Sequence, residues 1–295
     1  MKIVVAYIAT AGGRDAVALG TTLARTFDDA ELEICVVLPP EPPDPSAEVE
    51  RLADTLETAA RGWLDDAAAA VPADLSPTTT IVVHPNPAGG LIERAEEVGA
   101  DVLVIGGSGG GIVGRHTLGT VVNDVLHSSP VPVALAPLGF SHTGPSQITR
   151  ISAALGMRPG AEHLVDTVIG FARAGSVPLR LVSLVALDDM DHHRGTTVDA
   201  AVEHARGHIE RKTAEISERL DGTASTVSSA VIQGDSIENA IVELEWNDDD
   251  VIVVGSSRLA APRRIFLGTT AAKMLRVLAI PVSYTHLTLP TICSV

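Results

Sequence analysis

The sequence predicts an α/β protein with parallel sheets, made of two tandem copies of one domain. Three observations lead to this class. Short apolar runs that suit buried strands alternate with longer segments whose apolar residues recur at helical spacing. The length of 295 residues suits two domains of about 150 residues each. An offset of 149 residues relates the segment DVLVIGGS at Asp101 to DVIVVGSS at Asp250, so the chain contains an internal repeat.

Each half follows the same order of elements. In the first half, apolar runs predict five strands, at residues 2–9, 32–38, 78–83, 102–105 and 131–136. Apolar residues at helical spacing predict helices that include residues 16–27, 49–63, 91–98 and 119–126. In the second half the same patterns predict helices at 164–172 and 198–220, and strands at 179–186 and 226–232. Strands that alternate with helices in this way pair in parallel.

The repeat also sets the domain boundaries. We place the first domain at residues 1–141, a polar linker at 142–147 and the second domain at 148–281. The residues that follow depart from the repeat: the first domain continues as PVALA, whereas the second reads PVSYTH. The stretch VSYTHLTLPT resembles the translation of a sequencing-library adapter. We therefore set residues 282–295 apart as a non-native tail.

Composition narrows the possible ligands and the compartment. The net charge of −16 argues against a nucleic-acid partner, which requires a basic surface. No apolar run approaches the roughly 20 residues of a membrane-spanning helix, and the amino terminus lacks the pattern of a signal peptide. Cys35 is the only cysteine outside the tail, so we expect no disulfide framework and a cytoplasmic location.

Glycines follow the fourth strand of the first half in a pattern typical of phosphate binding. Gly106, Gly109 and the pair Gly119-Thr120 have the spacing G-x2-G-x9-G-[S/T], and Thr120 opens a helix. Glycine lets backbone N–H groups approach phosphate oxygens, and a helix start adds unpaired donors and a partial positive charge. The alternatives are glycines that supply a positive φ in a tight connection, and a threonine that only caps the helix.

This spacing, with the flanking segments VLVIGGSG, LGT and SPVPVALAP, resembles the universal stress protein family over residues 1–281. The resemblance implies two tandem Rossmann-like parallel five-stranded sheets flanked by helices, with strand order 3-2-1-4-5 in each. It also implies that the first domain binds ATP or ADP, with or without Mg²⁺, beside the switch point between its first and fourth strands. The implied nucleotide-binding residues are Thr10, Val37, Gly106, Gly109, Gly119 and Thr120.

Two positions depart from the family's pattern. Its first strand usually ends in an acid that holds the nucleoside, whereas this chain has Ile8 there and only Thr10 keeps polar character. In the second domain Gly255 and Gly268-Thr269 persist, but Arg258 replaces the second glycine, within a loop that also contains Arg263 and Arg264. We expect the second domain not to bind nucleotide; the alternative is that its arginines bind an anion of their own.

No catalytic arrangement is recognisable. We interpret Arg115, His116, His192-His193 and Asp248–Asp250 as exposed loop charges, and we expect no enzyme activity. The alternative for Arg115 and His116 is that they reach the phosphates of a bound nucleotide. The predicted function is that of an adenine-nucleotide-binding stress-response regulator with an unknown regulatory protein partner. The alternatives are a nucleotide-independent interaction or scaffold module, and a weak ATP hydrolase. The resemblance further implies pairing of the last strands, as an intrachain pseudo-dimer or a homodimer, for which the edge at residues 131–135 is suited.

Overall fold

A computed structural model provides the fold. It describes residues 1–42, 46–107, 114–116, 118–156, 161–187, 198–255 and 268–285. Gly109, Arg258, His192 and the tail beyond Thr285 lie outside these ranges.

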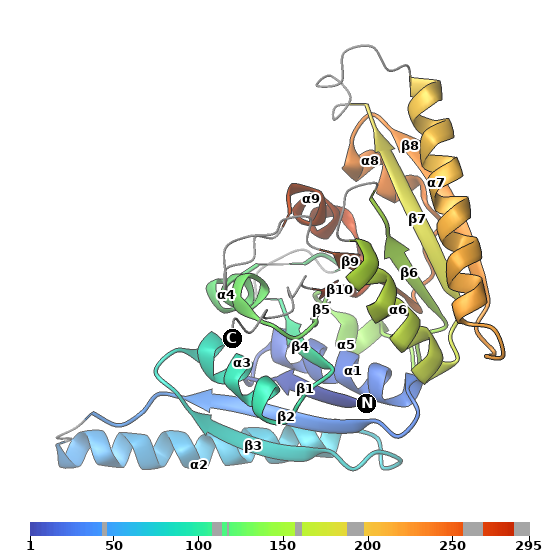
Figure 1. Cartoon of the computed structure of the whole chain (residues 1–295). Helices are drawn as coiled ribbons and strands as arrows, with labels where there is room; N and C mark the ends of the chain where they lie inside the picture. The colour runs from blue at the N-terminus through green and yellow to red at the C-terminus, as the bar shows by residue number, and fades with distance from the viewer. Residues whose placement is uncertain are drawn as a thin grey trace, which may run out of the picture.

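A single ten-stranded sheet runs through the molecule in the order β3-β2-β1-β4-β5-β10-β9-β6-β7-β8 (Figure 1). The strands of the first half are β1 (Lys2–Ala6), β2 (Glu31–Leu38), β3 (Thr78–Val83), β4 (Val102–Gly106) and β5 (Val133–Ala136). Those of the second half are β6 (Arg150–Ala154), β7 (Leu179–Ala186), β8 (Val227–Gly234), β9 (Asp250–Gly255) and β10 (Val282–Thr285). Within each half the strands are parallel and follow the expected order 3-2-1-4-5.

The two halves join through their last strands. β5 and β10 pair antiparallel, with Leu135 opposite Val282 and Val133 opposite Tyr284. This is the pairing of last strands that the resemblance implied, made within one chain, and it merges the two expected sheets into one. It also corrects the boundary at residue 281, because Val282–Thr285 form a strand whose side chains are buried. Apolar Val282 and Tyr284 provide the burial that keeps this strand in the fold. The non-native origin of the tail stays a prediction.

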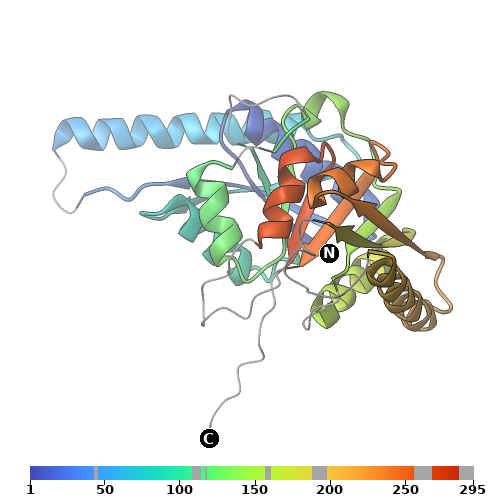
Figure 2. The same ribbon diagram turned by 90° about the horizontal axis from the view of Figure 1, so that it is seen from above.

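Helices cover both faces of the sheet, and each face has one core that spans both halves. One layer contains α1 (Ala11–Thr26), α2 (Ala47–Ala70), α5 (Phe140–Thr143), α6 (Ala161–Gly175) and α7 (Val198–Arg219). The other layer contains α3 (Pro87–Glu97), α4 (Thr120–Ser128), α8 (Ile237–Glu243) and α9 (Thr269–Val277). The two long helices, α2 and α7, lie at opposite ends of the molecule (Figures 1 and 2). No helix in the described ranges has the length and apolar character to cross a membrane.

The first strand is shorter than its apolar run predicts. β1 ends at Ala6 rather than at residue 9, because Thr10 caps the next helix: its hydroxyl oxygen accepts the Gly13 N–H at 3.2 Å. The chain must turn before this cap, so Ile8 leaves the sheet and is 57% exposed. The turn brings the α1 amino terminus to the carboxyl end of the sheet.

The segment predicted as a linker, residues 142–147, is fixed to α1, both within it and on either side. Within it, the Thr22 hydroxyl donates to the Pro145 carbonyl oxygen at 2.7 Å. Asp15 on α1 is buried, and its carboxylate accepts the N–H groups of Gly139 and Ser141 at 2.8 and 2.9 Å. The Ser141 hydroxyl donates to the same carboxylate at 2.6 Å. Further along, the Thr26 hydroxyl oxygen accepts the Ile148 N–H at 2.8 Å. These contacts hold the connection between the halves against the first helix.

Candidate functional site

The β1–α1 turn and the end of β4 meet at the carboxyl ends of the strands. A Cβ at Gly106 would overlap the Gly12 carbonyl oxygen, and a Cβ at Gly12 would overlap the carbonyl oxygen of Gly107. Both positions therefore require glycine for backbone packing at the switch point between β1 and β4. Backbone packing thus explains the glycine at position 106, in addition to the phosphate binding that the sequence suggested.

This packing leads to a stability prediction. We expect Gly106→Ala to lower the free energy of unfolding by about 1–3 kcal/mol, because the added methyl group would meet backbone atoms that cannot move aside. Gly62→Ala is the matched control, since a Cβ at Gly62, within α2, meets no atom within 4 Å. That control should stabilise the protein by up to about 1 kcal/mol. Urea unfolding measures both, and equal midpoints would contradict the packing argument.

The end of β2 presents an open main-chain edge at Val37. The last hydrogen bond between β2 and the β1 segment joins the Tyr7 N–H to the Cys35 carbonyl oxygen at 2.8 Å. Alternate residues of a parallel strand direct their N–H and C=O to the same neighbour, so Val37 directs both groups to the side on which Cys35 bonds. Among the described residues no backbone hydrogen bond continues this ladder beyond Tyr7. A free donor and acceptor side by side match the hydrogen-bonding edge of a purine base.

Helix α4 begins without a capping side chain. Gly119 is its N-cap, with φ −78° and ψ 173°, and makes no side-chain cap hydrogen bond. The Asn123 N–H donates to the Gly119 carbonyl oxygen at 2.9 Å, so the N–H groups of residues 120–122 have no acceptor within the helix. Thr120 is exposed at the first helical position, where its hydroxyl does not serve as the cap. Such a helix start favours an anion.

The structure therefore brings part of the expected site together. Thr10 belongs to the turn that contacts Gly106, and Val37 lies on the strand next to β1. Gly119 and Thr120 form the start of α4. Gly109 lies outside the described residues. Ile8 offers no polar group where the family has its acid.

Two cavities lie beside this region rather than in it. One of about 730 Å³ runs between α1, α2 and the linker, and Tyr7, Arg14 and Trp63 are among its lining residues. A second of about 880 Å³ lies between α2, β3 and the end of β2. Neither is lined by Gly106 or by the start of α4. Sequence patterns gave no sign of either cavity, because each is formed by residues from separate elements.

Arg115 and His116 are not free loop charges, which corrects our interpretation. The Arg115 guanidinium donates to the carbonyl oxygens of Arg276 and Val277, the former at 3.0 Å. The His116 Nε2 lies 2.9 Å from the Ile280 carbonyl oxygen, and a carbonyl accepts only, so this nitrogen holds the proton. Burial lowers the pKa of His116 from 6.5 to about 4. Both side chains thus contact the second half of the chain.

The second half repeats the uncapped helix start. Gly268 is the N-cap of α9 and makes no side-chain cap hydrogen bond, and Thr269 is the first helical residue. At Gly255, the counterpart of Gly106, an added Cβ would touch only the Leu164 side chain, at 3.5 Å or more. Among the described residues, the close backbone packing at Gly106 is therefore not repeated at Gly255. The arginine-rich loop lies outside the described residues.

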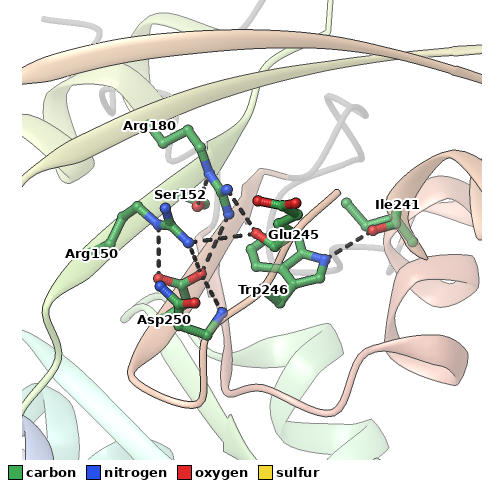
Figure 3. A network of polar contacts seen from close by, with 8 residues as sticks. Arg150, Ser152, Arg180, Ile241, Glu245, Trp246 and Asp250 are labelled. Carbon is green, nitrogen blue, oxygen red and sulfur yellow. Dashed lines mark hydrogen bonds and ion pairs between the residues drawn. The ribbon is translucent and has the colours of Figure 1, made fainter. Parts of the chain in front are cut away.

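At the opposite, amino-terminal end of the sheet, a buried ionic network surrounds Asp250 (Figure 3). We expected Asp250 at the surface, but it is 0% exposed. Arg150 Nε donates to the Asp250 carboxylate at 2.8 Å, and Arg180 Nη2 lies 3.5 Å from it. The Arg180 guanidinium also covers the Trp246 ring, 4.7 Å from its centroid. The sequence analysis missed this network. The sequence signal that could have indicated it is a charged residue at or next to the start of each of three strands, β6, β7 and β9.

These features define a class of protein: a tandem α/β protein with an open main-chain edge at the end of β2 and an uncapped helix start at α4 in its first half. The sequence matches the universal stress protein family over residues 1–137 and 147–284, and the chain belongs to that family. It is 26% identical to universal stress proteins of Mycobacterium tuberculosis (strain H37Rv) and Mycobacterium bovis, over 96% of this chain and 98% of each relative.

Solved structures agree on the fold. A universal stress protein from Archaeoglobus fulgidus superposes with a TM-score of 0.71 at 15% identity, covering 97% of this chain and 98% of that chain. A universal stress protein in complex with cAMP is 26% identical over 47% of this chain and 98% of that chain, with a TM-score of 0.35. At that TM-score the likeness says nothing about the ligand of this chain.

Proposed function

We propose that the first domain binds ATP or ADP at the carboxyl ends of β1, β2 and β4, and that the bound nucleotide regulates the protein's interaction with a partner protein in a cytoplasmic stress response. The observation that carries the proposal is the uncapped start of α4, where Gly119 follows the family's glycine pattern and three helical N–H groups have no acceptor within the helix.

The described residues fit the two ends of such a nucleotide. The Val37 N–H and C=O suit the edge of the adenine base, which main-chain groups recognise whatever the side chain. The start of α4 suits the phosphates, where the helix dipole favours negative charge. The Thr10 hydroxyl oxygen accepts the Gly13 N–H and keeps its own proton to donate. Among the described residues no group of three or more His, Cys, Asp or Glu is placed to hold a metal, so the phosphates themselves would supply the ligands of Mg²⁺.

The exposed Ile8 predicts which parts of the nucleotide contribute most to its binding affinity. Without a carboxylate at the end of β1, the ribose hydroxyls lack a charged acceptor, and the phosphates contribute a larger share of the binding energy. The proposal therefore expects ATP and ADP to bind more tightly than adenosine. Ligand binding would then stabilise one conformation that the partner recognises.

Gly119→Asp tests the proposal. An aspartate is a better N-cap than glycine and would stabilise α4 by roughly a few tenths of a kcal/mol, while its carboxylate accepts from the N–H groups at the helix start and repels phosphate. We expect the variant to fold at least as well as the wild type and to lose more than about tenfold in ATP affinity, as one lost charge-assisted contact implies. Isothermal titration measures this loss.

The internal repeat provides the matched control, because Gly268→Asp makes the same change at the start of α9. This control should keep the wild-type affinity. If only the Gly268→Asp control lost ATP binding, the nucleotide site would lie in the second domain instead.

The second candidate is a nucleotide-independent interaction module of the same fold, which Ile8 at the acid position favours. Absence of any heat of binding for wild-type protein at millimolar ATP and ADP would favour this candidate and reject the proposed function.

A further inference from the structure

We propose that the second domain positions the chain segment that leads into α4 through Arg115 and His116, so that nucleotide affinity in the first domain depends on the contact between the two halves. This inference rests on the proposed function for its effect on affinity. The positioning contact itself is tested without nucleotide.

The first step is the backbone on either side of these residues. The Gly114 N–H donates to the Leu138 carbonyl oxygen at 2.7 Å, and the Leu138 N–H donates to the Arg115 carbonyl oxygen at 3.0 Å. Gly114 has a φ of +77°, which favours glycine. A Cβ there would lie 3.6 Å from the Ala279 side chain. The segment is therefore tied to the end of β5 and lies against the second domain.

The second step is the Arg115 side chain, which ends on helix α9. Its guanidinium donates to the carbonyl oxygens of Arg276 and Val277, in the last turn of that helix. These carbonyls lack helical N–H partners, and the helix end carries partial negative charge. One arginine of the first domain thus caps a helix of the second. Because the partners are main-chain atoms, the contact does not depend on the identity of the side chains at residues 276 and 277.

The third step is His116, which lies next to the strand pairing that joins the halves. Its Nε2–H donates to the Ile280 carbonyl oxygen, two residues before β10 begins. Its other ring nitrogen, Nδ1, is buried and has no hydrogen-bond partner within the described ranges. Ile280 is itself buried. This contact therefore lies inside the joint between the halves and not at its solvent-exposed rim.

The effect on nucleotide binding follows from the short separation of His116 and Gly119 along the sequence. Gly119 lies three residues after His116, so displacement of residues 114–116 also displaces the start of α4. The hydrogen bonds of the two side chains are made with the second domain, and we propose that they act on the phosphate site through the backbone. They are positioning residues. By linkage, a nucleotide that orders the α4 start must also stabilise the joint between the halves.

The test compares variants that remove or keep each contact. We expect Arg115→Ala and His116→Leu each to weaken ATP binding about tenfold in isothermal titration, a usual size for coupling between sites. His116→Gln keeps an N–H donor and should recover most of the affinity. The matched control is Arg25→Ala, which removes an ion pair with Asp74 inside the first domain and should bind ATP like the wild type.

Hydrogen exchange tests the same contact without ligand. In nucleotide-free Arg115→Ala, peptides that cover residues 114–122 should exchange about tenfold faster than in the wild type, while peptides from α2 keep their rate. Addition of ATP to the wild type should slow exchange in residues 276–282 of the second domain. A purely structural role for Arg115 would not produce this last effect.

Each outcome decides one of the two proposals. Equal ATP affinity in Arg115→Ala, His116→Leu and wild type would overturn the positioning role. If the wild type binds no nucleotide, the proposed function fails, and the exchange of residues 114–122 in the nucleotide-free variants alone decides the positioning contact: unchanged exchange would overturn it.

Discussion

Asp250→Ala is expected to lower the free energy of unfolding by about 3–5 kcal/mol, the usual cost of removing one partner from a buried ionic pair. The carboxylate is 0% exposed and balances two arginines, Arg150 and Arg180. It also accepts the Asn247 N–H at 3.0 Å. Its loss leaves the guanidinium of Arg180, which is 7% exposed, without a full counter-charge in a place that water does not reach.

The rest of the network cannot compensate. Arg180 keeps neutral contacts with the Ser152 hydroxyl at 3.0 Å and the Glu245 carbonyl oxygen at 2.9 Å (Figure 3). Desolvation lowers the pKa of Arg180, and the nearby Arg150 acts in the same direction. Asp250 opposes both effects. Without Asp250 the two cations repel each other with no acid between them.

The internal repeat supplies the control for this prediction. Asp101 occupies the same place in the first half, but it is exposed, and the contact of its carboxylate is the Lys2 N–H at 2.7 Å. We expect Asp101→Ala to cost no more than about 1 kcal/mol. Urea unfolding of the two variants at neutral pH measures the difference. Similar losses at Asp101 and Asp250 would show that the buried network does not have the effect described.

The second large effect is a pH dependence that arises from His116. Burial holds the pKa of His116 at about 4 in the folded protein, against 6.5 for the ordinary value. The unfolded chain therefore takes up this proton first as the pH falls. The stability that neutral His116 allows is complete above pH 6.5, declines as the pH falls, and is lost once the pH passes below about 4. Since one pKa unit corresponds to about 1.4 kcal/mol, the total loss is about 3 kcal/mol.

A comparison with His116→Gln isolates this effect. Glutamine keeps a donor for the Ile280 carbonyl oxygen but does not titrate, whereas the carboxylates titrate equally in both proteins. We expect the wild type to lose about 3 kcal/mol more than the variant between pH 7 and pH 4. Chemical unfolding at a series of pH values provides the measurement. Parallel stability curves would mean that His116 is accessible to water in solution.

Patterns along the chain predicted most of the local structure. The apolar run at Val102–Ile105 became a buried strand. The offset between Asp101 and Asp250 correctly indicated a repeat. These predictions succeeded for one reason: periodic patterns depend on residues that are close in sequence, so they can be recognised without knowledge of the fold.

Apart from the length of β1, the main errors involve residues whose surroundings come from distant parts of the chain. Nothing next to His116 in the sequence indicates that Ile280 covers it, and nothing next to Asp250 indicates Arg180. Residues 282–285 looked foreign by comparison with the repeat, yet Tyr284 fills a place beside Val133. Burial depends on contacts across the fold, and composition alone does not determine which charged or unusual segments receive them.

The sequence by itself determined the α/β class, the duplication and the place of the glycine pattern before α4, because local periodicity and an internal copy contain that information. The strand order within each half was implied by the resemblance to the family. Only the tertiary structure decided that the two halves share one sheet, that Val37 presents an open edge and that Arg115 and His116 belong to the joint between the halves. The open edge at Val37 depends on β1 ending before β2. The contacts of Arg115 and His116 depend on packing between segments more than 100 residues apart, such as Arg115 and Arg276 with a separation of 161.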